Sequence, residues 1–229
     1  GVELPADAVA VGTDEAGKGP VLGPMVAAAV RCRSDRVPDA ADDSKRLSPA
    51  TRESVDATLR DADGVAVALA VVPTERIDDP ETDMNSLTVA AHAEAAARVA
   101  REGDVLVADA GDVNESRFAR RVREGVAEHT GGARSLDVRA RHGADGASPL
   151  VAAASVVAKV ERDARIAALD ADHEEHGPVG SGYPSDPKTR AFLRRYVDAT
   201  GELPECARAS WSTSVDVLAA AEQSGLSEF

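Results

Sequence analysis

Short apolar runs alternate with amphipathic segments along the first two thirds of the chain, and the last third has a helical pattern. Extended segments are predicted where a run is short, apolar and bounded by turn residues, at residues 9–13, 21–32, 64–72, 104–109 and 135–141. Helices are predicted at residues 48–62, 86–102, 114–124, 148–170, 188–200 and 213–223. Ser48-Pro49 and Ser148-Pro149 each resemble an N-cap followed by proline at the first helical position. The alternation predicts an α/β layered fold with a mostly buried sheet and a helical C-terminal extension.

Length and cysteine content narrow the class of protein. The 229 residues suggest one large domain, or one domain with a small appendage. Two cysteines, Cys32 and Cys206, provide neither a disulfide framework nor a zinc site. The apolar stretches near residues 21–30 and 149–158 are only about ten residues long, too short to span a bilayer. With no secretory signal visible, we expect a cytoplasmic protein.

The charge balance initially argues against a nucleic-acid partner. The chain has 40 acidic and 26 basic residues, a net charge of −14, whereas a basic footprint is usual in nucleic-acid binding. Only four of the basic residues are lysine, and 3% of all residues are aromatic. This composition favours a protein adapted to concentrated salt, where the screening length falls to about 3 Å and carboxylate repulsion weakens. The alternative is an ordinary acidic protein encoded by a GC-rich genome.

Four acidic residues lie at predicted strand ends or in loops. Asp14 and Glu15 follow the first strand, Asp109 closes the run 104–109, and Asp145 precedes a long helix. Functional crevices of open α/β sheets lie beyond the carboxyl ends of the strands. Carboxylates gathered there form an oxygen site for Mg²⁺ or Mn²⁺, and two such ions about 4 Å apart can clamp a phosphodiester. The alternative for each acid is a helix cap or a turn residue.

Residues 12–19 also match a phosphate-binding loop of the pattern G-x-x-x-x-G-K. The match fails chemically, because Gly19 replaces the hydroxyl residue that ligates Mg²⁺. Asp14 and Glu15 would place two negative charges inside the loop, and the next segment has two prolines and an extended pattern. A nucleotide triphosphatase is therefore disfavoured.

Five ordered segments resemble ribonuclease HII in its archaeal form. They are GTDEAGKGPVLGPMV at residues 12–26, DSKRLS at 43–48, DAGDVN at 109–114, Ala144-Asp145 with AASVVAKVERD at 153–163, and GSGYPSDP at 180–187. The resemblance implies a ribonuclease H-like fold with a mixed central sheet. It divides the chain into a catalytic domain, residues 1–185, and a helical extension, residues 186–229.

The resemblance also implies an endonuclease that cuts the RNA strand of RNA–DNA hybrids and single ribonucleotides in DNA duplexes. Asp14, Glu15, Asp109 and Asp145 would be its catalytic carboxylates and would hold two Mg²⁺ or Mn²⁺ ions, with Asp14 bridging. The products would carry 3′-hydroxyl and 5′-phosphate ends. The alternative from another class is a hybrid-binding protein without catalysis.

The resemblance further implies a set of substrate-binding residues: Gly17, Lys18, Gly19, Tyr183, Lys45 and Lys159. The glycine-rich turn would read the ribose 2′-hydroxyl through its backbone, and Tyr183 would pack at the ribonucleotide junction. Lys159 and Arg162 share one helix face, where both could meet a phosphate. We expect a monomer, with a possible sliding-clamp contact through the C-terminus.

The chain departs from the family pattern at two positions. Lys18 stands where the family usually has arginine, and Gly143 stands where archaeal members usually have lysine. Asp112 and Asp137 are therefore kept as weaker alternatives to Asp109 and Asp145.

Other basic residues keep two interpretations. Arg190, Arg194 and Arg195 form either a duplex-binding stripe or a solvated helix face. The histidines show no metal-ligand spacing; His142 is close enough in sequence to Asp145 to assist proton transfer, but a surface role is favoured.

Overall fold

The computed structural model describes residues 4–5, 7–43 and 47–226. The chain folds into two compact units, each assembled from segments that are separated in sequence. The first unit comprises residues 1–16, 26–71 and 83–161, and the second comprises residues 17–25, 72–82 and 162–229. The residue at which we divided the chain from sequence, 185, falls inside the second unit. The division into a catalytic domain, residues 1–185, and a helical extension, residues 186–229, stays a prediction.

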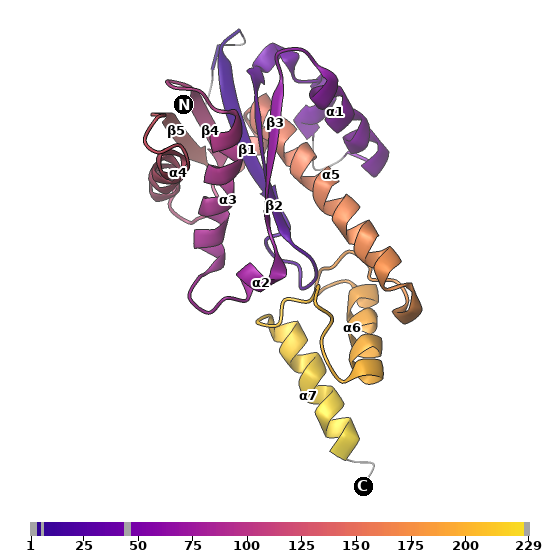
Figure 1. The fold of residues 1–229 in the computed structure, drawn as a ribbon. Coiled ribbons are helices and arrows are strands. Elements are labelled where there is room, and N and C mark those ends of the chain that lie inside the picture. Colours follow the sequence, from indigo (N-terminus) through magenta and orange to yellow (C-terminus); the bar gives the residue numbers. More distant parts are fainter. Residues whose placement is uncertain (1–3, 6, 44–46, 227–229) are drawn as a thin grey trace. The chain divides into compact units, whose positions relative to one another are not determined.

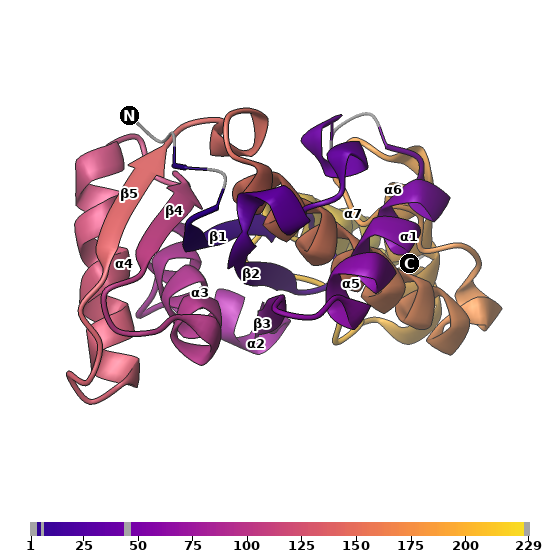
Figure 2. The same cartoon turned by 90° about the horizontal axis from the view of Figure 1, so that it is seen from above.

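The first unit is built on a five-stranded mixed sheet (Figures 1 and 2). The spatial order β3-β2-β1-β4-β5 is formed by β1 (Val9–Ala16), β2 (Met25–Arg33), β3 (Ala66–Val72), β4 (Val105–Asp109) and β5 (Asp137–Arg141). Strand β1 pairs antiparallel with β2 and parallel with β4, and β4 pairs parallel with β5. The carboxyl ends of three parallel strands therefore share one edge of the sheet.

Helices cover both faces of this sheet, as Figures 1 and 2 show. They are α1 (Pro49–Asp61), α3 (Met84–Val99), α4 (Glu115–His129) and α5 (Pro149–Asp172). Helix α3 packs on β1 and α4, and α4 packs on β5. Residues of α1 and α5 share a buried cluster with β2, so these two helices lie on the same side of that strand.

The sequence predicted the main elements but missed short ones. The 3₁₀ turns η1 (Ser34–Arg36), η2 (Asp39–Asp43) and η4 (Glu174–His176) and the short helix α2 (Thr74–Ile77) were not predicted. The strand predicted from residue 21 begins at Met25. The reason is that the amides of Val21 and Leu22 donate to the carbonyl of Gly182, at 2.8 and 3.2 Å, instead of joining the sheet.

The second unit has its own core. Helices α6 (Pro187–Thr200) and α7 (Ser212–Leu226) pack together around a buried apolar cluster. That cluster includes Leu22, Val179, Phe192, Leu193 and Val197. Within the described residues, no helix is long and apolar enough to cross a membrane.

Candidate active site

The four predicted carboxylates come from the shared carboxyl edge of β1, β4 and β5. Thr13 pairs with Ala108 across the parallel ladder, so the next residues, Asp14 within β1 and Asp109 at the end of β4, lie on neighbouring strands. Asp145 follows β5 in the 3₁₀ turn η3 (Ala144–Gly146). The structure therefore brings Asp14, Glu15, Asp109 and Asp145 to one edge of the first unit.

Asp14 and Glu15 project from opposite faces of β1, because successive side chains alternate along a strand. The Asp14 carboxylate is hydrogen-bonded to Ser155 of α5. Glu15 Oε2 lies 2.7 Å from Nε2 of His92, which belongs to α3 on the other face. The end of β1 thus offers carboxylates to both sides of the sheet edge, and each is held by a different helix.

Burial and mutual repulsion raise the pKa of Asp14 to about 7. Its side chain is only 6% exposed, and the charges of Glu15 and Asp109 further disfavour its ionised form. The pKa of Asp109 is also raised, mainly by burial, although a hydrogen bond from Ala144 lowers it. Carboxylates that repel each other in a dry site are poised to accept a cation.

A local turn places the fourth carboxylate beside the third. Gly143 adopts a left-handed conformation, with φ of 65°, at the start of η3. The amide of Ala144 then donates to Oδ1 of Asp109 at 3.1 Å, which ties the turn to the end of β4. Asp145 is 6% exposed, and its charge contributes to raising the pKa of Asp109. Glycine at position 143 therefore suits this turn, although lysine is the usual residue at this position in the family pattern.

The donor set fits a hard divalent cation. All four groups are carboxylates, the ligands that Mg²⁺ and Mn²⁺ prefer, and their repulsion is relieved by positive charge. Within the described residues, no group of three or more histidine, cysteine or acidic side chains lies close enough together to hold a metal ion by itself. Mg²⁺ usually retains several waters, so water and substrate oxygens would have to supply the remaining ligands.

The two weaker alternatives are engaged elsewhere. Asp112 is paired with Arg117, whose hydrogen bond at 2.5 Å holds the pKa of that carboxyl below its usual range. Asp137 pairs with Val105 at the start of β4, so it lies at the opposite edge of the sheet from Asp109. It is exposed and bonded to Arg139 at 2.7 Å.

A buried arginine, Arg208, hydrogen-bonds to the backbone of the glycine-rich turn at residues 17–19 of the second unit. Arg208 is fully buried, and its guanidinium donates to the carbonyls of Gly17, Lys18 and Gly23 at 2.6, 2.9 and 3.0 Å. Burial lowers the pKa of Arg208 to about 10. The guanidinium also lies 4.9 Å from the ring centroid of Trp211, whose indole N–H donates to Gly19 at 3.3 Å. The carbonyls of this turn are thus fixed by side chains from the C-terminal segment.

Tyr183 lies beside the same turn. A Cβ added to Gly19 would stand 3.9 Å from Cε1 of Tyr183, whose residue is 40% exposed. The guanidinium of Arg162 lies 5.2 Å from the tyrosine ring centroid and donates to the carbonyl of Ser181 at 3.1 Å. Arg162 is 5% exposed, and burial lowers its pKa. It therefore supports the tyrosine loop, rather than standing with Lys159 as an open phosphate contact.

The structure describes one of the two remaining predicted lysines. Lys159 is half-buried on the part of α5 that belongs to the first unit. Lys45 lies outside the described residues.

Four residues that structure the site had no role in the sequence prediction: His92, Ser155, Arg208 and Trp211. Ser155 lies in a segment that resembles the family, and Arg208 and Trp211 form a short Arg-x-x-Trp pattern. The only sequence signal for His92 is a polar ring in an alanine-rich helix. Each acts through a contact between elements distant in sequence, which local patterns do not reveal.

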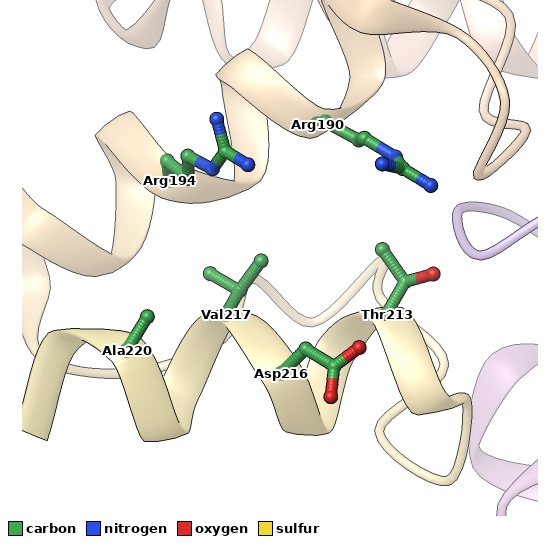
Figure 3. A pocket seen from close by; sticks show the side chains of 6 residues that line it. All are labelled: Arg190, Arg194, Thr213, Asp216, Val217 and Ala220. Atoms are coloured by element: carbon green, nitrogen blue, oxygen red, sulfur yellow. The ribbon is translucent and has the colours of Figure 1, made fainter.

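A separate pocket of about 160 Å³ lies between α6 and α7 (Figure 3). It is lined by Arg190, Arg194, Thr213, Asp216, Val217 and Ala220, and none of the predicted site residues is among them. The Asp216 carboxylate gives the wall a mixed charge.

Comparisons with known proteins agree with this fold. The sequence profile described as Ribonuclease HII matches residues 11–214. Ribonuclease HII of Halobacterium salinarum is 57% identical over 218 residues, 95% of this chain and 98% of the relative. The ribonuclease H2 structure from Pyrococcus horikoshii has a TM-score of 0.82 at 32% identity, covering 94% of this chain and 100% of that one. Ribonuclease HII in the PCNA complex from Archaeoglobus fulgidus has a TM-score of 0.76 at 36% identity, covering 90% and 95%.

The mixed sheet, its flanking helices and these structural neighbours define a ribonuclease H-like hydrolase. The chain belongs to the ribonuclease HII family, which degrades RNA in RNA–DNA hybrids. The predicted fold class and family are confirmed.

Proposed function

We propose that Asp14, Glu15, Asp109 and Asp145 hold two divalent metal ions and hydrolyse phosphodiester bonds of RNA paired with DNA. The observation that carries this proposal is the gathering of these carboxylates at one strand edge, with the pKa of Asp14 raised to about 7. A surplus of buried negative charge is destabilising unless a cation compensates it. The family as a whole depends on divalent metals; Mg²⁺ or Mn²⁺ is our proposal for this chain.

In this proposal, the position of each carboxylate determines its role. When bound, two divalent ions supply an activated water and neutralise the charge that develops on the scissile phosphate. Asp14, which interacts electrostatically with both Glu15 and Asp109, would be the carboxylate shared by the two ions. Asp145, beside Asp109, is placed to complete the second. In-line attack that displaces the 3′ oxygen leaves 3′-hydroxyl and 5′-phosphate ends.

Recognition of the ribose belongs to the second unit in this proposal. Arg208 engages the carbonyls of the Gly17–Gly19 turn, which fixes the conformation in which its backbone meets a sugar. Reading the 2′-hydroxyl through the backbone tolerates Lys18 in place of arginine. Tyr183, exposed beside Gly19, packs against the ribonucleotide junction, and the substrates include single ribonucleotides in DNA duplexes.

The remaining parts of the proposal concern partners and location. The Archaeoglobus fulgidus relative was solved in complex with PCNA. We propose a corresponding sliding-clamp contact through the C-terminus of this chain, whose residues 227–229 lie outside the described structure. We also propose a cytoplasmic location, which the two free, buried cysteines support because a reducing compartment keeps thiols unpaired. A monomer is part of the same proposal.

A cleavage assay tests the catalytic proposal. The protein is incubated with Mg²⁺ or Mn²⁺ and a DNA duplex carrying one ribonucleotide, at salt concentrations from about 0.1 to 3 M. We expect a cut at the ribonucleotide, and loss of cleavage of about 10³-fold or more in Asp14→Asn and Asp109→Asn. Asp137→Asn, at the opposite edge of the sheet, is the matched control and should cut normally. Normal duplex binding by an inert wild type would instead support a binding protein.

A further inference from the structure

We propose that His92 is a positioning residue that holds Glu15 in its metal-binding orientation. This inference rests on the proposed function, because it assumes that Glu15 is a metal ligand. His92 itself does not reach the metal or the substrate in this proposal. It acts only by fixing the carboxylate of Glu15 through a hydrogen bond to Oε2.

Each nitrogen of the His92 imidazole lies near a polar group. His92 is fully buried, and its Nε2 lies 2.7 Å from Oε2 of Glu15. Its Nδ1 lies 3.3 Å from the hydroxyl of Thr13, which also lies 2.8 Å from the carbonyl of Ala28 and can donate its single hydrogen to either. A buried ring with both nitrogens engaged has one defined orientation, so it can define the orientation of its partner.

The second oxygen of Glu15 lies beside the segment that follows β4. A Cβ built on Gly111, two residues after Asp109, would stand 3.5 Å from Oε1 of Glu15. One oxygen of Glu15 is therefore held by His92, and the other lies beside the segment that follows β4. Without the imidazole, the long side chain would regain rotamers in which Oε2 is no longer held in this position.

The packing of α3 shows why a histidine can reach this position. Phe118 of α4 contacts the imidazole edge-on, with ring centroids 5.2 Å apart and an interplanar angle of 86°. A Cβ on Gly125 of α4 would come within 2.7 Å of the Ala93 side chain, so the two helices approach closely beside His92. The ring is thus packed by Phe118 and bonded by Glu15 and Thr13. These two roles can be separated experimentally.

Two substitutions at position 92 distinguish the bond to Glu15 from the bond to Thr13. The amide nitrogen of glutamine corresponds to Nε2 and can still donate to Glu15, whereas that of asparagine corresponds to Nδ1 and cannot reach it. We expect His92→Asn to weaken Mn²⁺ binding by about 10–100-fold, the usual effect of losing such a supporting contact. His92→Gln should retain most of the affinity. The measurement is calorimetric titration of the full chain with MnCl₂ alone, without substrate.

Cleavage kinetics give a second readout. For His92→Asn, the Mg²⁺ concentration at half-maximal rate should rise by about 10–100-fold, while KM for the hybrid stays unchanged at saturating metal. Phe118→Leu is the packing control. It disturbs the contact to the ring without touching Glu15, so it should lower the melting temperature and leave Mn²⁺ affinity unchanged.

A second mutation checks that His92 acts through Glu15. In a Glu15→Gln background, His92→Asn should have no additional effect on Mn²⁺ affinity. Wild-type affinity in His92→Asn, or equal losses in His92→Asn and Phe118→Leu, would overturn the positioning role while leaving the proposed function intact. Absence of both Mn²⁺ binding and cleavage in the wild type would overturn the proposed function, and this inference with it.

Discussion

Asp14 illustrates how a residue proposed for catalysis can lower the stability of the fold. The carboxylate lies in a dry setting beside Glu15 and Asp109, and the pKa of Asp14 rises from its ordinary 3.8 to about 7. The protonated form is therefore favoured in the folded state. The stability from this group is fully present below about pH 3.8 and is lost as pH rises through about 7. Without metal, ionised Asp14 destabilises the fold at neutral pH.

Asp14→Asn should therefore be more stable than wild type in EDTA at pH 8. Asparagine never ionises, so the advantage should grow by roughly 2 kcal/mol between pH 5 and pH 8. Thermal unfolding at the two pH values measures it. Asp137→Asn, which removes an exposed carboxylate, should show little change. An Asp14→Asn protein no more stable than wild type at pH 8 would contradict this account of the site.

Arg208 shows how one side chain can determine a loop. Its guanidinium satisfies the three carbonyls of Gly17, Lys18 and Gly23 at once, which a single ammonium cannot do in that geometry. Arg208→Lys should therefore lower the free energy of unfolding by about 2–4 kcal/mol. Denaturant unfolding provides the measurement. Arg194→Lys, at an exposed position of α6, should cost less than about 0.5 kcal/mol, and equal losses in the two variants would contradict the role given to Arg208.

At the scale of elements, the site depends on how closely helices approach β1. Gly12 and Asp14 share one face of this strand, and Thr13 and Glu15 share the other. Leu150 and Ser155 of α5 serve the first face. His92 of α3 serves the second. The two helices therefore place different supports behind two consecutive carboxylates.

The approach of α5 leaves no room for a side chain at position 12. A Cβ on Gly12 would stand 2.2 Å from the carbonyl carbon of Leu150, and backbone cannot rotate away as a side chain can. Gly12→Ala should destabilise the fold by about 2–3 kcal/mol. Gly146→Ala, where no atom lies within 4 Å of the added Cβ, is the matched control. Chemical denaturation compares them, and a neutral Gly12→Ala would show that α5 is not packed this closely.

At the scale of the whole molecule, we interpret the net charge as an adaptation to a salty solvent and not as an indication of the binding partner. The value of −14 initially argued against nucleic acid, yet the chain belongs to a family that degrades RNA in hybrids. Four of the acids are proposed to face cations. Relatives at high identity come from halophilic archaea, which fits the interpretation that the remaining acidic excess is an adaptation to salt.

We expect the melting temperature to rise as KCl increases from about 0.1 to 3 M. The screening length falls from about 10 Å to below 3 Å in that range, so repulsion among surface carboxylates weakens. Differential scanning calorimetry at constant pH measures the rise. An equal or higher melting temperature in 0.1 M KCl would leave the charge unexplained.

The sequence predicts those features of the fold that depend on interactions between residues close together in the chain. The period of apolar residues and the Ser-Pro helix starts predicted the major helices and strands, because those signals are local. The motif at residues 12–26 identified the family, and with it the mixed sheet. The start of β2 was wrong by four residues, because Val21 and Leu22 bond to Gly182, more than 150 residues away.

The sequence by itself determined the class of elements, the family and the acidic residues proposed for catalysis, since these follow from local periodicity and from contiguous motifs. Only the tertiary structure decided which supports those residues receive. His92 behind Glu15, Ser155 beside Asp14 and Arg208 behind the glycine turn are contacts between segments 77 to 191 residues apart. Such contacts exist because folding brings distant polar groups into a dry interior, where each must find a partner.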